Sequence, residues 1–152
     1  MILGGSLLPV VKNLGGEIIV KSTTETGDQT EDGAIEVRKE QEFTIYLSPF
    51  TGPLRDRFTI AHELGHYFLH SKVGKKRIRV PRAGGGREEW EANWFAAGFL
   101  MPEEMFRKEW GNCHGNCHGN IGMIASKFAV STFTTRRRAQ ELGLISDTPV
   151  KA

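Results

Sequence analysis

The chain has 152 residues, of which 39% are hydrophobic and 25% are charged, and its formal net charge is +2. This length suits one domain with a buried core, and the balanced charge is typical neither of a disordered chain nor of a broad nucleic-acid-binding surface. With no apolar run near the roughly 20 residues of a membrane span, no basic segment of a signal peptide and only two cysteines, we expect a cytoplasmic protein without disulfides.

The first 50 residues predict mainly a sheet. A short helix is expected at Leu7–Leu14, because Gly15 and Gly16 follow it as a stop. Residues 22–33, rich in Thr, Gly and Asp, predict a loop. Strands are expected at Glu17–Lys21, Ala34–Arg38 and Glu42–Leu47. The last of these alternates apolar and polar residues, so one of its faces should be buried. We expect a small antiparallel or mixed sheet, whose edge offers a place for an extended peptide to add as a strand.

The stretch Arg57–His70 reads RFTIAHELGHYFLH and contains an HExxH motif. Its apolar residues recur at three- and four-residue spacings, which predicts a helix with a wide buried face. In a helix His62 and His66 lie one turn apart, about 40° apart around the axis, so both imidazoles can hold one metal ion. Glu63 follows the first histidine and can reach a water on that metal. Gly65 between the ligands would let another element approach closely. The alternative is a buried helix with two solvated histidines.

A third ligand is expected from Arg87–Pro102, where aromatic residues and alanines predict a second helix that is buried on much of its surface. Glu89 is the first choice, because it shares a helical face with Asn93, which can support a histidine ligand as a hydrogen-bond partner. Glu91 lies on another face and is the second choice. Acidic residues in a first turn also have a simpler explanation, a favourable interaction with the helix dipole.

The two predicted helices together resemble the motifs of a known protein family. HELGHYFLH followed about twenty residues later by EANWFAAGFLMP is similar to the ImmA/IrrE family of zinc metallopeptidases. The similarity continues upstream at Arg55–Thr59 and downstream at the segments that begin at Phe128 and Leu142. The resemblance implies the gluzincin arrangement, in which two helical histidines, a glutamate base and a glutamate on the next helix form the site.

Carried over residue by residue, the resemblance makes His62, His66 and Glu89 the metal ligands and Glu63 the general base. One Zn²⁺ per chain is expected, with Mn²⁺ as a possible substitute. Members of the family typically cleave a transcriptional repressor of the helix-turn-helix type, which releases genes of mobile elements or stress responses. A repressor protein is therefore the expected partner.

Two further residues and a basic segment are candidates for supporting roles. Tyr46 and His70 are candidates for donors that stabilise the tetrahedral oxyanion. His70 also suits a structural role at the end of its helix, because a histidine there interacts favourably with the helix dipole. The basic segment Lys72–Arg82 predicts a solvated loop, or alternatively a surface that recognises an acidic partner.

The segment Asn112–Asn120 repeats Cys-His-Gly-Asn. Its two Cys-His pairs offer the ligand types of a Cys₂His₂ zinc site, but adjacent pairs four residues apart are cramped for a tetrahedral ion and lack a long spacer. A short polar loop is the preferred interpretation. The four residues concerned are Cys113, His114, Cys117 and His118.

Residues 121–145 predict a helix, a turn and a second helix. Ser131 is a good N-cap of the second helix, and Gly143 with Leu144 suits a Schellman ending. The pair resembles a DNA-binding helix-turn-helix, with three arginines at 136–138 on its second helix. Because the side chains of consecutive residues point about 100° apart around a helix, the three arginines cannot all face one groove. Direct DNA binding is therefore not expected.

The combined prediction is one α+β domain over residues 1–152. Residues 1–50 are mainly sheet, 51–110 hold the metal-binding helices, and 121–145 form the C-terminal helical pair. The expected function is a zinc-dependent endopeptidase. The alternatives are a DNA- or protein-binding regulator with a vestigial metal site and a metal-dependent hydrolase of a non-peptide bond.

Overall fold

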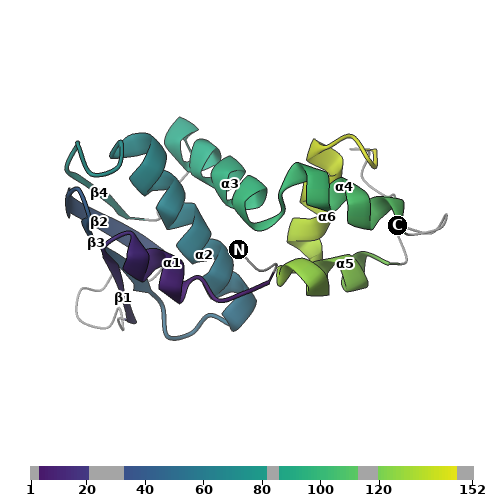
Figure 1. Cartoon of the computed structure of the whole chain (residues 1–152), viewed down its shortest axis with the longest axis horizontal. Coiled ribbons are helices and arrows are strands. Elements are labelled where there is room, and N and C mark those ends of the chain that lie inside the picture. Colours follow the sequence, from purple (N-terminus) through teal and green to yellow (C-terminus); the bar gives the residue numbers. More distant parts are fainter. Residues whose placement is uncertain (1–3, 21–32, 82–85, 113–119, 147–152) are drawn as a thin grey trace. The chain divides into compact units, whose positions relative to one another are not determined.

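The computed structural model describes residues 4–20, 33–81, 86–112 and 120–146 (Figure 1). The chain divides into two compact units, Ser6–Phe99 and Leu100–Ala152 together with Met1–Gly5. Helices and a four-stranded sheet make up the first unit, and helices make up the second. The α+β class and the mixed sheet are as predicted. Within the described residues, no helix is both long and apolar enough to cross a membrane.

The sheet has the strand order β1-β3-β2-β4. Strand β1 runs parallel to β3, whereas β2 pairs antiparallel with both β3 and β4. The three predicted strands are present, and the strand bounds are β1 Gly16–Val20, β2 Gly33–Lys39, β3 Glu42–Leu47 and β4 Ile78–Pro81. Both outer strands, β1 and β4, leave an edge of the sheet without a further strand among the described residues.

Strand β4 corrects the prediction of a continuous loop at Lys72–Arg82. Apolar and basic residues alternate in this segment: Ile78 and Val80 are half-buried, whereas Arg79 is exposed. The many basic residues around them made this strand pattern hard to recognise. Val80 and Ile78 pair with Ile35 and Val37, which lie on the buried face of β2. Tertiary pairing with β2 therefore makes a strand of a segment whose composition favours a solvated loop.

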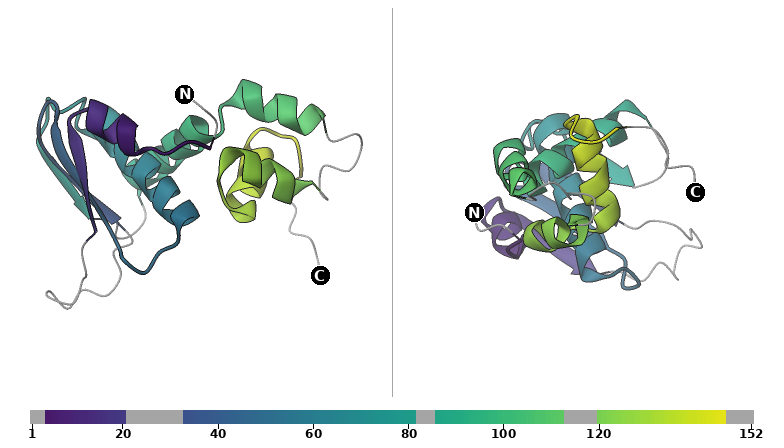
Figure 2. Two further views of the ribbon diagram at one scale, coloured as in Figure 1. Left: turned by 60° about the horizontal axis from the view of Figure 1, so that its bottom comes forward. Right: turned by 90° about the vertical axis from the view of Figure 1, so that its right-hand side faces the viewer.

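The buried face of the sheet carries Ile35, Val37, Phe43 and Ile45, each at most 1% exposed. Helix α1 (Leu8–Asn13) and helix α2 (Pro53–Gly65) lie on one side of the sheet, which the left view of Figure 2 shows nearly edge-on. The opposite face carries polar pairs, such as the hydrogen bond from Thr44 Oγ1 to Glu17 Oε1 (3.0 Å). One side of the sheet therefore forms the core that supports α2.

The HExxH helix changes its winding within the motif. Helix α2 ends at Gly65 and continues as a π-helical turn, η2 (His66–His70), in which Ser71 N–H donates to the His66 carbonyl at 2.9 Å. A π turn closes over five residues instead of four and is typical of functional sites. The predicted helix is present over its full length, but its last turn is wider than an α-helix.

Helix α3 (Arg87–Leu100) lies against α2 at Gly65. A Cβ at Gly65 would be 3.1 Å from both Ala92 Cα and Phe95 Cβ, and Ala92 is fully buried. The expectation that Gly65 permits a close approach is confirmed. The helix is less buried than predicted, however, because Trp90 and Trp94 are 60% and 41% exposed.

The second unit contains α4 (Glu103–Gly111), α5 (Ile121–Phe128) and α6 (Thr132–Glu141). Ser131 caps α6 by accepting a hydrogen bond from Thr134 N–H at 3.1 Å. At the other end Gly143 has φ +72°, and Leu144 N–H donates to the Ala139 carbonyl at 2.8 Å, as a Schellman ending requires. Both predicted helix boundaries are confirmed.

The three arginines of α6 have different environments. Arg138 is 5% exposed and donates from Nε to the Met101 carbonyl at 3.1 Å, whereas Arg136 and Arg137 are exposed. Burial lowers the pKa of Arg138. Arg138 therefore serves the packing of this unit and does not present its charge to a partner.

Candidate metal centre

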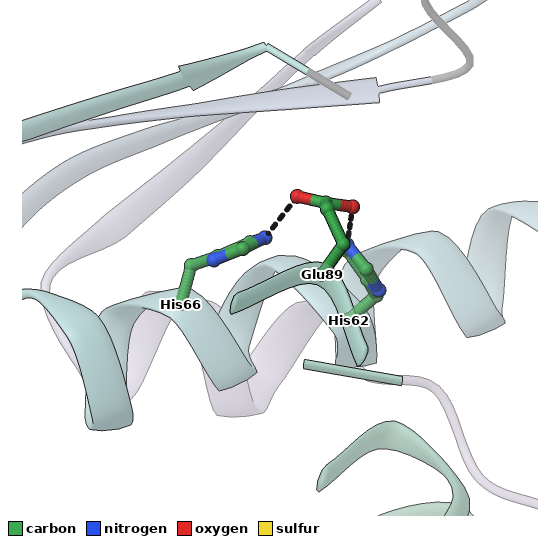
Figure 3. A group of neighbouring side chains, drawn as sticks. All are labelled: His62, His66 and Glu89. Atoms are coloured by element: carbon green, nitrogen blue, oxygen red, sulfur yellow. Dashed lines mark hydrogen bonds and ion pairs between the residues drawn. The ribbon is translucent and has the colours of Figure 1, made fainter. Parts of the chain in front are cut away.

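Three side chains from two helices converge in the first unit (Figure 3). His62 Nε2 lies 3.0 Å from one carboxylate oxygen of Glu89, and His66 Nε2 lies 2.9 Å from the other. Both histidines are at most 1% exposed, and the Glu89 side chain is 17% exposed. One potential ligand atom from each residue lies within 4.8 Å of the other two. The structure thus brings together the three residues that the sequence suggested as metal ligands.

Their spacing and chemistry fit a metal ion. In a tetrahedral zinc site with bonds of about 2.0–2.2 Å, neighbouring ligand atoms are roughly 3.4 Å apart. Three nitrogen and oxygen atoms within 4.8 Å of one another are close enough to share one such ion. Burying the Glu89 carboxylate beside two imidazoles costs solvation free energy. A bound cation would offset this cost, because its charge is opposite to that of the carboxylate.

The tautomer of His62 is set by its second ring nitrogen. Asn93 Oδ1 lies 2.8 Å from His62 Nδ1, and an amide oxygen can only accept a hydrogen bond. His62 therefore donates from Nδ1 to Asn93, which leaves Nε2, the nitrogen that faces Glu89, as its metal-binding atom. Asn93 occupies the supporting position that the sequence suggested for it, on the same helix as Glu89.

His66 is held in its neutral form. Burial, together with the nearby His62, lowers its pKa to about 4, against the opposing effect of Glu89. A neutral imidazole is the form that binds a metal ion. At neutral pH His66 therefore has a nitrogen lone pair available to a cation.

Glu63 is completely buried at the interface of α2 and the sheet. A Cβ at Gly33, the first residue of β2, would lie 3.5 Å from Glu63 Oε1 and only 2.4 Å from Thr59 Cγ2. The start of β2 can therefore pass close to the HExxH helix only because residue 33 has no side chain. Sequence reasoning missed this role, because a glycine that ends a polar loop has an ordinary explanation as a turn residue.

The remaining candidates are placed less centrally. Tyr46 pairs with Ala34, whereas Gly33 and Ile35 occupy the sheet face that meets α2. Strand alternation therefore directs Tyr46 to the opposite face, away from the cluster. His70 contacts Nδ1 of His66, on the far side of that ring from Glu89, and Glu91 lies beside His70 instead of joining the three ligands. The cysteines and histidines at 113–118 lie outside the described residues.

An HExxH helix under a small mixed sheet, with a glutamate supplied by the next helix, defines the class of metallopeptidase-like proteins. Within that class, the family model of the IrrE N-terminal-like domain, a peptidase family, matches residues 18–140. The chain belongs to this family, and the resemblance inferred from its motifs is confirmed.

A curated relative is Metallopeptidase ImmA from Bacillus subtilis (strain 168), which is 29% identical over 92 residues. The aligned region covers 60% of this chain and 53% of that relative. The chain therefore spans about half the length of the curated relative it matches.

Proposed function

We propose that this chain is a zinc-dependent endopeptidase whose site is formed by His62, His66, Glu89 and Glu63. The observation that carries the proposal is the convergence of both HExxH histidines on the Glu89 carboxylate at 2.9–3.0 Å. A buried helix with two solvated histidines would not place a carboxylate from another helix between them. Membership of a peptidase family supports peptide-bond hydrolysis over the hydrolysis of another bond.

Zn²⁺ bound by these residues would lower the pKa of a water ligand and polarise the substrate carbonyl. Glu63, next to His62 in the chain, would accept a proton from the attacking water and pass it to the leaving amine. Complete burial keeps its carboxylate away from bulk solvent, which strengthens its interaction with the reacting groups. Asn93 would hold the first histidine in orientation. We assign no catalytic role to Tyr46.

The substrate that we propose is a protein, specifically a transcriptional repressor of the helix-turn-helix type. This choice is supported by the resemblance to the ImmA/IrrE family. Cleavage is tested by incubating purified repressors of this type with the wild-type protein and with Glu63→Gln, and by identifying the fragments by mass spectrometry. The proposal requires cleavage by the wild-type protein at a defined bond and none by the variant.

A regulator that acts through the helices of residues 121–145 is the competing hypothesis. The burial of Arg138 reduces the exposed basic surface of α6 to two of its three consecutive arginines. A non-enzymatic regulator would keep its activity in Glu63→Gln, whereas a peptidase would lose it. The same variant therefore distinguishes the two functions.

The metal site is tested by the metal content of the purified protein. About one zinc per chain is expected in the wild type, and His62→Ala and Glu89→Ala should each lose it. Glu91→Ala should retain this stoichiometry at saturating zinc, because Glu91 faces His70 and not the three-residue cluster. Zinc that survives His62→Ala would instead implicate the Cys-His segment and refute the proposed site.

We further propose that both compact units belong to one peptidase domain. The family match begins at residue 18 in the first unit and ends at residue 140 in the second, so it includes parts of both. Thermal unfolding followed by calorimetry tests this proposal. A single cooperative transition is expected, and two separable transitions would show that the units unfold independently.

A further inference from the structure

The two candidate histidine ligands are supported in different ways. His62 donates to Asn93 on α3, but His66 has its second nitrogen beside another histidine of its own helix. His66 Nδ1 lies 2.8 Å from His70 Nδ1, and the two ring centroids are 4.9 Å apart. Since this is a hydrogen-bond distance, one of the two nitrogens carries a proton and the other accepts it.

The contact joins two residues about one helical turn apart, and it occurs where the winding changes. In an α-helix, His70 would lie about 40° beyond His66 around the axis, because four residues exceed one turn of 3.6 residues. The turn that begins at His66 instead closes over five residues, as shown by the hydrogen bond from Ser71 N–H to the His66 carbonyl. A full turn then holds more than four residues, so His70 falls short of one turn by about as much as it would exceed one in an α-helix. His70 therefore stays on the same helical face as His66, behind the candidate ligand.

Glu91 favours one of the two neutral tautomers of His70. Its carboxylate oxygen Oε2 lies 3.7 Å from His70 Nε2, beyond hydrogen-bond length but close enough for a strong electrostatic effect. The His70 side chain is 9% exposed and the Glu91 side chain is 32% exposed, so water screens this interaction in part. Arg87 Nε in turn donates to Glu91 Oε1 at 3.0 Å. A carboxylate at this position favours the tautomer of His70 with its proton on Nε2.

The tautomer of His70 affects His66, one of the candidate metal ligands. A cation bound through His66 Nε2 requires a lone pair on that atom, so His66 would then carry its proton on Nδ1 and donate it to His70 Nδ1, which accepts when the proton of His70 is on Nε2. His66 Nε2 then has a lone pair directed at the position between the imidazoles and Glu89 (Figure 3). The opposite tautomer would place a proton on His66 Nε2 and prevent it from binding metal through that atom.

We propose that His70 and Glu91 are positioning residues that hold His66 in its metal-binding tautomer and orientation. The inference rests on the proposed metallopeptidase function and assigns to His70 a role different from an oxyanion donor. His70 acts through His66, and Glu91 acts through His70. Each candidate histidine ligand then has its own acceptor, Asn93 for His62 and His70 for His66.

The test compares the metal affinity of the full-length wild-type chain with that of four variants. Zn²⁺ binding is measured in competition with a chelator of known affinity, and the visible absorption spectrum of the Co²⁺-loaded protein reports ligand geometry. The variants are His70→Leu, which removes the acceptor, His70→Asn, whose side-chain oxygen replaces Nδ1, Glu91→Gln, and the exposed control Glu88→Gln.

We expect His70→Leu to bind Zn²⁺ about 10–100-fold more weakly, as is typical when a hydrogen-bond partner of a histidine ligand is lost. His70→Asn should recover most of this loss and restore the Co²⁺ spectrum. Glu91→Gln should fall between His70→Leu and the wild type, and Glu88→Gln should match the wild type. Circular dichroism of each variant checks that the helices are retained.

Two results would overturn the inference. Wild-type affinity in His70→Leu would show that the contact with His66 has no effect on metal binding. An equal loss in His70→Leu and His70→Asn would show that packing matters and the acceptor does not. If the wild type binds no metal, the proposed function fails and the inference fails with it, whereas metal binding that is insensitive to residue 70 refutes the inference alone.

Discussion

Gly65 offers a quantitative test of how the candidate ligands are brought together. It is buried between the two motif histidines and lies close to the helix that supplies Glu89. In Gly65→Ala the new Cβ would lie 3.1 Å from Ala92 Cα and from Phe95 Cβ. Carbon atoms pack best at about 3.5–4.0 Å. Because Ala92 Cα belongs to the backbone of α3, relieving the overlap requires moving that helix by a few tenths of an ångström.

Two free energies oppose each other in this variant. Replacing glycine by alanine inside a helix stabilises it by about 1 kcal/mol. Inserting a methyl group into a packed interface destabilises by about 1–3 kcal/mol. Gly98 on α3 supplies a matched control, because a Cβ there meets nothing within 4 Å. Gly98→Ala should show the helix-propensity gain alone, so the difference between the two variants isolates the crowding.

We therefore expect Gly65→Ala to be about 1–3 kcal/mol less stable than Gly98→Ala. For a protein of this size, the melting temperature of Gly65→Ala should be lower by about 2–4 °C for each kcal/mol. Because α3 carries Glu89, zinc affinity should also fall in Gly65→Ala and stay unchanged in Gly98→Ala. Equal melting temperatures and equal affinities in the two variants would refute the close approach of α2 and α3 as the factor that assembles the site.

Variants of Glu63, Gly33 and Arg138 test the proposed base and two close contacts of the fold. Glu63→Gln should retain metal while proteolytic activity falls by about 100-fold or more, measured by fragment analysis; retained activity would remove Glu63 as the general base. Gly33→Ala should lower the free energy of unfolding by about 1–3 kcal/mol in chemical denaturation, because its Cβ overlaps Thr59 at 2.4 Å. Arg138→Leu should lower the free energy of unfolding by a similar amount, because the buried Met101 carbonyl loses its donor. Arg137→Leu is the exposed control and should have little effect. Equal melting temperatures of these two variants would contradict a structural role for Arg138.

The helical boundaries show which features can be derived from local sequence. Ser131 and Gly143 act on backbone groups within a few residues of themselves, so their capping roles follow from residue type and spacing. The pairing of His62 with His66 is equally local, since it depends only on the helical period. Predictions of this kind need no knowledge of the rest of the chain.

Strand β4 and the position of Tyr46 show where local reasoning was insufficient. Ile78 and Val80 form a strand because β2 offers a partner at that edge, and the basic residues beside them indicated a loop. Tyr46 is polar, aromatic and close in sequence to the HExxH helix, but the register of β3 directs it to the opposite face. In both cases pairing partners far away in the sequence decide the outcome.

The sequence by itself determined the chemical identity of the candidate site, because the HExxH spacing and the shared face of Glu89 and Asn93 follow from the helical period. Tertiary structure decided which carboxylate reaches the histidines, since the close packing of α2 and α3 at Gly65 brings Glu89 to them and leaves Glu91 beside His70. It also decided the winding of η2, which no residue pattern indicated. The physical reason is that side-chain spacing is encoded within one helix, whereas the approach of two helices depends on the packing of the whole unit.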